Sequence, residues 1–373
     1  MANVAVVGAG HAGVEAAFTL AKAGVKVVLY TNEPRLPYFR PRLISVAFGQ
    51  ATPEAIVMKP MGMYEQAGIE LRHEAVTQLE VASRQVNGQV YDGVILAQGS
   101  QPFVPPFAGS GASRVMSLWS MEDALKVRQG VDSGVTLAII GGGVLGLEAA
   151  LRAALAGMRV TVIEVAPALL GGCLGPQAEA VLRKTFEAKG ITLKLGCNIR
   201  EITADAIEFV DGTQILAQVI LGSTGARPNI TLAQSSGVAI TRGIACAADL
   251  SIAPGVYAAG DQASPSQGRP VCAVMRAMRM GALAAKNLLA AWQGQSAQTW
   301  EEPVLPLFMK VDDVEFHTVG DCFATDVMEE RIDDATVPTI WKSVLKRDGK
   351  VVGLRWVGTR AGFADWEKQL VRM

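Results

Sequence analysis

Two stretches of the chain repeat the same order of apolar strand, glycine-rich turn, apolar helix and second apolar strand. In the first stretch, a β-branched run over residues 4–7 precedes the glycine-rich residues 8–13, and a helix over 14–23 and a strand over 25–30 are predicted after it. The second stretch, 135–164, follows the same order about 133 residues later, with its helix predicted over 147–156. A strand–helix–strand unit joins two parallel strands. The pattern therefore predicts two copies of one α/β nucleotide-binding domain.

Further along the chain, other short apolar runs end in small residues. They predict buried strands over 93–97, 218–221 and 255–259, followed by an apolar helix over 277–292. Prolines and polar residues then predict a linker over 296–302. An Asp-Gly pair between two last strand-like runs predicts a hairpin, across which Trp341 and Trp356 are expected to pack.

The first glycine-rich turn has the G-x-G-x-x-G spacing of dinucleotide-binding sites, with glycines at 8, 10 and 13. In such a turn one glycine makes the bend, one lets the backbone approach a pyrophosphate, and one lets helix and strand pack closely. The pyrophosphate then lies at a helix N-terminus. Glu33 follows about 25 residues after Gly8, where a carboxylate accepts hydrogen bonds from a ribose hydroxyl.

The second turn repeats the spacing with glycines at 141, 143 and 146, and Glu164 ends its second strand. A carboxylate at that position accepts from a free 2′-hydroxyl and repels a 2′-phosphate, and no arginine follows it. The second site is therefore predicted to prefer NADH over NADPH. Because a simple dehydrogenase needs one dinucleotide site, we expect one site for FAD and one for NAD.

Composition narrows the class of protein. Half of the residues are hydrophobic and the net charge is −1, which favours a large core and argues against nucleic acid as a partner. The five cysteines are odd in number and form no CxxC pair, so they predict neither a disulfide framework nor a zinc site. Residues 135–174 are apolar but carry charges, so no membrane insertion is expected. No signal peptide is recognisable, and we expect a cytoplasmic protein that holds no metal.

With these motifs the sequence resembles the flavoproteins with two dinucleotide-binding domains, the pyridine nucleotide-disulfide oxidoreductase superfamily. Residues 36–43 resemble the segment beside the flavin in that group. Residues 92–99 resemble its Ala-Thr-Gly strand end, with Gln98 in place of Thr. Residues 256–261 resemble the late motif whose aspartate contacts the ribityl chain of FAD. The matches cover roughly residues 1–290 in family order.

The resemblance implies a glutathione-reductase-like α/β fold with two Rossmann-like domains and a small C-terminal α+β domain. The expected boundaries are 1–110 and 237–295 for the FAD domain, 111–236 for the NAD domain, and 296–373 for the last domain. The FAD contacts are expected at Gly8, Ala9, Gly10, His11, Ala12, Gly13, Asn32, Glu33, Arg40, Pro41, Val76, Ala97, Gly99, Gly260 and Asp261. The NAD contacts are expected at Gly141, Gly143, Val144, Leu145, Gly146, Glu164 and Gly225.

Within the superfamily, chain length and the short last domain are similar to the NAD(P)H:rubredoxin and flavorubredoxin reductases. This resemblance implies that Lys310 approaches the flavin, that Glu148 lies near the nicotinamide, and that the backbone of Val76 touches the adenine. Ser45 departs from the pattern, since relatives that reduce iron–sulfur proteins often carry lysine there. The short last domain is more typical of a monomer than of a dimer.

Missing cysteines narrow the choice of electron acceptor. Disulfide reductases of the superfamily carry a cysteine pair on the helix after the first turn, and another branch carries one cysteine shortly after residue 40. The corresponding stretches here, 14–20 and 44–49, contain no cysteine. The resemblance therefore implies that electrons leave directly from the flavin, without thiol exchange.

The function expected from the sequence is a rubredoxin–NAD reductase-like enzyme that passes electrons from NADH through FAD to a small acidic iron–sulfur or rubredoxin-type carrier. Ferredoxin reductase, an NADH oxidase without a thiol relay, and a redox-sensing flavoprotein are the alternatives. An NADH:quinone reductase and a tRNA-modifying flavoprotein are less well supported, because residues 362–373 form no long basic amphipathic helix and the net charge is near zero.

Overall fold

The computed structural model describes residues 2–265, 273–334 and 336–371. The chain divides into two compact units, each assembled from three segments. Unit 1 contains Met1–Arg42, Pro53–Gln101 and Ala226–Pro303, and unit 2 contains Leu43–Thr52, Pro102–Gly225 and Val304–Met373.

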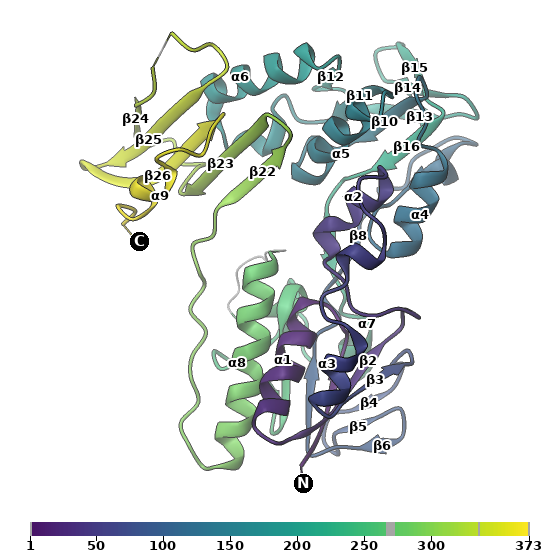
Figure 1. The fold of residues 1–373 in the computed structure, drawn as a ribbon, viewed down its shortest axis with the longest axis vertical. Helices are drawn as coiled ribbons and strands as arrows, with labels where there is room; N and C mark the ends of the chain where they lie inside the picture. Colours follow the sequence, from purple (N-terminus) through teal and green to yellow (C-terminus); the bar gives the residue numbers. More distant parts are fainter. Residues whose placement is uncertain (1, 266–272, 335, 372–373) are drawn as a thin grey trace. The chain divides into compact units, whose positions relative to one another are not determined.

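Unit 1 is built on a six-stranded sheet (Figure 1). Its strands follow in the order β19 (Ser251–Ala253), β20 (Val256–Ala258), β7 (Gly93–Leu96), β1 (Asn3–Val7), β2 (Lys26–Thr31) and β3 (Ile69–His73). All neighbouring pairs are parallel except β19 with β20. The strands β1 and β2 are runs of buried apolar residues rich in valine, as expected of parallel strands covered on both faces.

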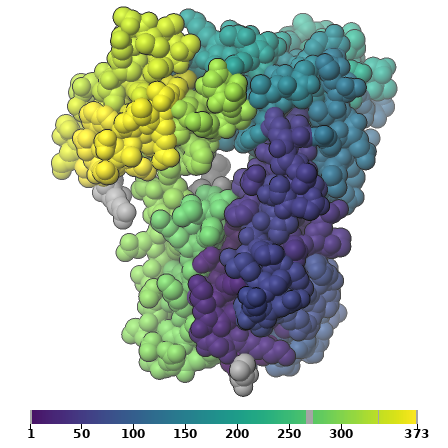
Figure 2. Space-filling view, in the orientation of Figure 1, coloured from purple at the N-terminus to yellow at the C-terminus, as the bar shows by residue number. Residues whose placement is uncertain are grey.

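Two helices lie side by side on this sheet, α1 (His11–Lys22) and α8 (Val274–Trp292) (Figures 1 and 2). Their contact is made by small residues. A Cβ atom added to Gly281 of α8 would lie 2.1 Å from the carbonyl oxygen of Ala12 in α1. Glycine at this position therefore lets α8 approach the first turn of α1.

The other elements of unit 1 are short. They are η1 (Arg40–Arg42), η2 (Glu54–Ile56), α3 (Met61–Gln66), β4 (Leu79–Glu80), β5 (Gln85–Val86), β6 (Gln89–Val90), β17 (Ala226–Pro228), α7 (Thr231–Ser235), β18 (Ile244–Ala245), η5 (Gly260–Gln262) and β21 (Ala263–Ser264). The strand β8 (Ser100–Pro102) spans the point where the chain passes from unit 1 to unit 2.

Unit 2 contains a second sheet of the same kind. Its strands follow in the order β12 (Thr192–Leu195), β11 (Arg159–Glu164), β10 (Thr136–Ile140), β16 (Val219–Gly222) and β9 (Val115–Met116), and all of them are parallel. Its other elements are α2 (Leu43–Ala47), η3 (Ala112–Arg114), α4 (Met121–Gln129), α5 (Val144–Leu155), η4 (Leu169–Gly172), α6 (Gly175–Ala188), β13 (Ile199–Ile202), β14 (Ala206–Phe209) and β15 (Gln214–Leu216).

The C-terminal part of unit 2 is an antiparallel sheet. It has the order β22 (Leu307–Val311), β23 (Val314–Gly320), β26 (Lys350–Val357), β25 (Trp341–Arg347) and β24 (Met328–Arg331), with one short helix, α9 (Phe363–Glu367). Its core joins Val344 and Leu354 of the sheet to Phe363 of α9.

The predicted fold class is confirmed: two Rossmann-like parallel sheets are present, together with a small C-terminal α+β part. The three predicted helices start three residues earlier than expected, at His11, Val144 and Val274. In α1 and α5 the N-caps are Gly10 and Gly143, so the last residues of each glycine-rich turn already form the first helical turn.

The predicted hairpin is present as β25 and β26, but the predicted pairing of its tryptophans was wrong. Trp341 is paired with Val357, and Trp356 is paired with Lys342. Neighbouring positions on a strand point to opposite faces, so the two indole rings lie on opposite faces of the sheet. An irregularity in the register between Leu345 and Lys346 shifts the pairing by one residue.

Candidate functional site

The first glycine-rich turn leaves β1 at the point where the sheet order reverses. β2 lies on one side of β1 and β7 on the other, and such a switch point opens a crevice at the carboxyl ends of the strands. Gly8 has φ +108°, and a Cβ atom there would lie 2.4 Å from the carbonyl oxygen of Ala97, which follows β7. A Cβ atom on Gly13 would lie 1.8 Å from the carbonyl oxygen of Gly8. The turn can therefore close only with glycine at both positions.

The turn after β10 repeats these contacts. Gly141 has φ +119°, and its added Cβ would lie 2.1 Å from the carbonyl oxygen of Ser223, which follows β16. A Cβ atom on Gly146 would lie 2.1 Å from the carbonyl oxygen of Gly141. The two sites are thus built by the same backbone approach between strand end and helix.

The middle glycine of each turn is not required by packing. Gly10 and Gly143 are the N-caps of α1 and α5, neither has a side-chain cap, and a Cβ atom on either would meet nothing within 4 Å. Open space at an uncapped helix N-terminus, beside the positive end of the helix dipole, fits a diphosphate group. The residues present therefore fit a dinucleotide at both turns.

Glu33 lies just beyond β2 and is already held by two donors. The hydroxyl of Tyr38 donates to its Oε2 at 2.5 Å, and Arg40 donates to its Oε1 at 2.6 Å. The imidazole Nδ1 of His73 lies 2.8 Å from the backbone oxygen of Glu33. These contacts fix the carboxylate at the edge of the first site. The other predicted contacts here are exposed: Asn32 precedes Glu33, and Pro41 follows Arg40.

Glu164, at the end of β11, is fixed by backbone donors. Its Oε2 accepts from the N–H of Gly142 at 2.7 Å, and its Oε1 accepts from the N–H of Ala166 at 2.8 Å. The carboxylate is thus tied to the second glycine-rich turn itself. Val144 and Leu145 form the first turn of α5 and are half-buried, and Gly225 lies in the loop after β16 with φ +102°.

Two more strand ends meet the first turn. Leu96 of β7 is paired with Val7 and with Ala258 of β20, so residues 97 and 259 follow at the same edge as Gly8. Ser100 donates to Asp261 Oδ2 at 2.8 Å across 161 residues of sequence. A Cβ atom on Gly260 would lie 3.1 Å from Cβ of Ala12. The structure therefore brings together the predicted segments 8–13, 97–99 and 260–261.

His11 is buried in the first turn of α1, and its Nε2 has no hydrogen-bond partner among the described residues. Burial, with a smaller contribution from Arg40, lowers the pKa of His11 to about 4. Its ring lies 5.7 Å from that of Phe39. The imidazole is therefore neutral at neutral pH. Of the remaining predicted contacts, Ala9 lies in the turn, and Val76 is half-buried between β3 and β4.

The two predicted catalytic residues both lie in unit 2. Glu148 of α5 accepts two hydrogen bonds from Arg152, the closer at 2.8 Å. Lys310 of β22 keeps 66% of its side chain exposed, and its Nζ lies 3.4 Å from Glu315 Oε2. Both side chains are ionic groups with a partner of opposite charge, and their predicted roles stay predictions.

Sequence reasoning missed three polar residues of the first site. Tyr38 and Ser100 hold the carboxylates of Glu33 and Asp261. The side chain of Gln262 is fully buried, and neither of its amide atoms has a partner among the described residues. Burying an amide without hydrogen-bond partners costs free energy. Gln262, like the open space at Gly10, therefore fits a polar ligand at this edge of unit 1. Tyr38 lies within the segment 36–43 that resembles the family's flavin-side segment, whereas Ser100 and Gln262 each lie one residue beyond such a segment.

The cysteines lie away from both glycine-rich turns in sequence. Burial raises the pKa of the Cys173 and Cys246 thiols to about 12 and also raises the pKa of Cys322. These thiols are therefore poor nucleophiles. The four cysteines of the described residues are free, and Cys272 lies outside the described residues.

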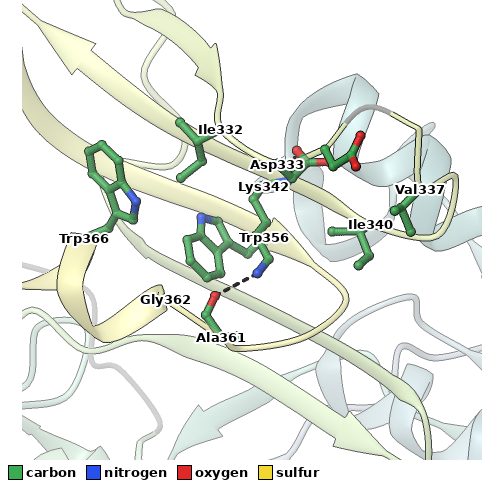
Figure 3. Close-up of a pocket in the computed structure, with 10 residues that line it drawn as sticks. Ile332, Asp333, Val337, Ile340, Lys342, Trp356, Ala361, Gly362 and Trp366 are labelled. Carbon is green, nitrogen blue, oxygen red and sulfur yellow. Dashed lines mark hydrogen bonds between the residues drawn. The ribbon is translucent and has the colours of Figure 1, made fainter.

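A separate cavity of about 260 Å³ lies in the C-terminal sheet of unit 2 (Figure 3). Its walls include the indoles of Trp356 and Trp366 and the ammonium group of Lys342. That ammonium donates to the carbonyl of Ala361 at 2.7 Å and stands 4.5 Å from the centre of the Trp356 ring. None of the predicted site residues lines this cavity.

Two kinds of feature are absent from the part of the chain that the structure describes. None of its helices has the length and apolar character needed to cross a membrane. It also contains no group of three or more His, Cys, Asp or Glu side chains that could hold a metal ion.

Two glycine-rich turns, each at a switch point of a parallel sheet and each leading into a helix N-terminus without a side-chain cap, are the features of a protein that holds two dinucleotides. Comparison with known proteins identifies the family: the pyridine nucleotide-disulphide oxidoreductase profile matches residues 2–281. The chain belongs to this family, so the predicted resemblance to the superfamily is confirmed. It is an oxidoreductase of a family that uses FAD and a nicotinamide dinucleotide.

Individual relatives are about one-third identical to this chain over the residues that align. Rubredoxin-NAD(+) reductase of Ectopseudomonas oleovorans is 33% identical over 278 residues, which cover 69% of this chain and 71% of that protein. Nitrite reductase (NAD(P)H) of Bacillus subtilis is 30% identical over 370 residues, which cover 94% of this chain. This chain spans only 45% of the length of that nitrite reductase.

A solved structure supports the fold over nearly the whole chain. The covalent putidaredoxin reductase–putidaredoxin complex matches with a TM-score of 0.85 and 24% identity, covering 99% of this chain and 92% of that one. At this identity the likeness shows the fold.

The buried His11 predicts a loss of stability in mild acid. Its folded pKa of about 4 lies below the ordinary histidine pKa of 6.5, so the unfolded chain binds the extra proton first as the pH falls. Between pH 7 and pH 5 the ligand-free protein should lose about 2 kcal/mol of unfolding free energy from this residue alone. Urea unfolding at both pH values, compared with His11→Met, measures it. An equal pH dependence in the variant would contradict the assignment.

Proposed function

We propose that this chain is an FAD-dependent NADH oxidoreductase that delivers electrons to a one-electron carrier protein, with rubredoxin as the first candidate. The observation that carries the proposal is the combination of two dinucleotide-type turns with helices that lack sulfur. Neither α1 nor α2 contains a cysteine. A thiol relay therefore has no residues at the positions where the family places one.

The proposed FAD site is the crevice of unit 1. The N-terminus of α1, opened by Gly10, would hold the diphosphate, and Glu33 would hold a ribose hydroxyl. Asp261, oriented by Ser100, would accept from the ribityl chain. Bound FAD supplies hydride acceptance from a nicotinamide and release of electrons one at a time. The chain's own groups bind the cofactor, orient it and keep His11 neutral beside it.

The proposed NAD site is the crevice of unit 2. The N-terminus of α5, opened by Gly143, would hold the second diphosphate. Glu164 is fixed by two backbone N–H groups, so its charge stays at the turn and would repel a 2′-phosphate. This supports NADH over NADPH. Glu148, held by Arg152, is proposed to lie near the nicotinamide.

Several features support a carrier protein as the acceptor. The thiols of Cys173, Cys246 and Cys322 stay protonated because burial raises their pKa. The exposed Arg42 and Lys310 are proposed to attract an acidic carrier through long-range electrostatics. A relative that the chain matches is named for rubredoxin.

A second candidate acceptor has its own support. The match to the nitrite reductase extends over 94% of this chain, whereas the match to the rubredoxin reductase covers 69%. The nitrite reductase therefore matches a larger share of this chain. On this alternative, the acceptor would be the redox centre of a nitrite-reducing protein. Ferredoxin reduction, direct oxidation by oxygen and slow redox sensing remain the other outcomes to test.

The two middle glycines predict a matched pair of variants. Gly10→Ala and Gly143→Ala add a methyl group to open space, so each should change the free energy of unfolding by less than about 1 kcal/mol. Gly10→Ala should lose bound FAD, whereas Gly143→Ala should keep FAD and raise the KM for NADH at least tenfold. Absorbance spectra and steady-state kinetics distinguish them, with Gly62→Ala on α3 as a control in open space. Full FAD content in Gly10→Ala would refute the first site.

The acceptor is tested by turnover. With NADH as donor, rubredoxin should be reduced faster than ferredoxin, nitrite-reductase redox domains and oxygen, each compared at equal concentration. Stopped-flow reoxidation of the reduced protein ranks them under single-turnover conditions. Rubredoxin reduction no faster than oxygen consumption would defeat the rubredoxin assignment, and the leading carrier would replace it.

A further inference from the structure

A buried arginine lies at the start of α8, beside the proposed FAD site. The side chain of Arg276 is 2% exposed. Its guanidinium donates to both carboxylate oxygens of Glu302, at 2.7 and 3.2 Å, and to the carbonyl of Gly260 at 3.3 Å. Gly260 directly precedes Asp261. The guanidinium therefore links the residues proposed to hold the flavin to a carboxylate outside them.

Glu302 is supplied by a segment that is fastened along α8 (Figure 1). The side chain of Asn287 exchanges hydrogen bonds with the backbone of Gln298, at 2.8 and 2.9 Å. The indole of Trp300 donates to Glu302 Oε2 at 2.9 Å and lies 5.7 Å from the Arg276 guanidinium. Residues 298–302 were predicted as linker, and they hold a fixed carboxylate against the first turn of α8.

The charges of Arg276 and Glu302 do not cancel at the buried edge beside Gly260. Glu302 keeps 45% of its side chain exposed, so water screens its field, whereas the guanidinium is shielded from water. The nearby Cys246 thiol adds no compensating charge, because burial raises its pKa to about 12. The first turn of α8 contains no acidic residue and its N-cap makes no side-chain hydrogen bond. The edge at Gly260 therefore carries a net positive field from α8, against the fixed charge of Asp261.

We propose that Arg276 is a positioning residue whose charge raises the reduction potential of the flavin at Gly260–Asp261, and that Glu302 weakens this effect. The inference rests on the proposed function, which places FAD at that edge. Reduction adds negative charge to the flavin ring system, so a buried cation nearby favours the reduced form. Removing the charge of Arg276 should then lower the reduction potential, and removing the charge of Glu302 should raise it.

The test measures the midpoint potential of bound FAD by spectroelectrochemistry in full-length protein. Arg276→Gln should lower the equilibrium constant for reduction about tenfold, which is about 30 mV for a two-electron couple. Glu302→Gln should raise the potential, because it leaves the guanidinium without its counter-charge. Arg276→Lys should retain most of the wild-type potential. Lys286→Gln removes an exposed positive charge from the same helix and should change nothing.

A merely structural pair would behave differently. If the pair only holds α8 in place, Arg276→Gln and Glu302→Gln should shift the potential in the same direction or leave it unchanged, and either result overturns the proposal. If Arg276→Gln fails to fold, a potential in Glu302→Gln that does not rise is sufficient to refute it. Flavin content distinguishes failure of the proposed function from failure of this inference. Wild-type protein that binds no flavin refutes the proposed function. Variants that bind flavin but show unshifted potentials refute only this inference.

Discussion

The close approach of a strand end to a helix start, made twice with the same backbone atoms, is the constraint on which the molecule depends. The carbonyl of Gly8 occupies the place of a Cβ atom on Gly13, and the carbonyl of Gly141 does the same for Gly146. Each contact anchors a helix N-terminus at a switch point of a parallel sheet. The space left at the intervening glycine is what makes each site able to receive a diphosphate.

The two crevices share a backbone and differ in their side chains. In unit 1 the carboxylate of Glu33 is held by side chains, Tyr38 and Arg40, whereas in unit 2 Glu164 is held by backbone N–H groups. Unit 1 adds a second polar edge from α8 and η5, where a buried guanidinium donates to the Gly260 carbonyl. This extra edge is consistent with a cofactor that stays bound and whose chemistry is set by its surroundings.

Local sequence predicted the glycine-rich turns and the parallel sheets, because the spacing of glycines and the runs of apolar residues can be read within short segments. It could not predict the Ser100–Asp261 hydrogen bond, which joins residues 161 apart in sequence. The hairpin of β25 and β26 shows how one extra residue in a strand moves a side chain to the opposite face of the sheet. The Asp348-Gly349 turn pairs Arg347 with Lys350, and an unbroken register would have paired Trp341 with Trp356. The irregularity after Leu345 adds a residue to β26, so the two indoles lie on opposite faces of the sheet.

The central claim is a flavin that takes electrons from NADH and passes them on without cysteine. Anaerobic titration of the purified protein with NADH, followed by visible absorbance, tests it most directly. The purified protein should be yellow, and one equivalent of NADH per bound FAD should fully bleach its flavin band. A colourless protein that binds no added FAD, or a titration that needs a second equivalent to reduce a disulfide, would contradict it.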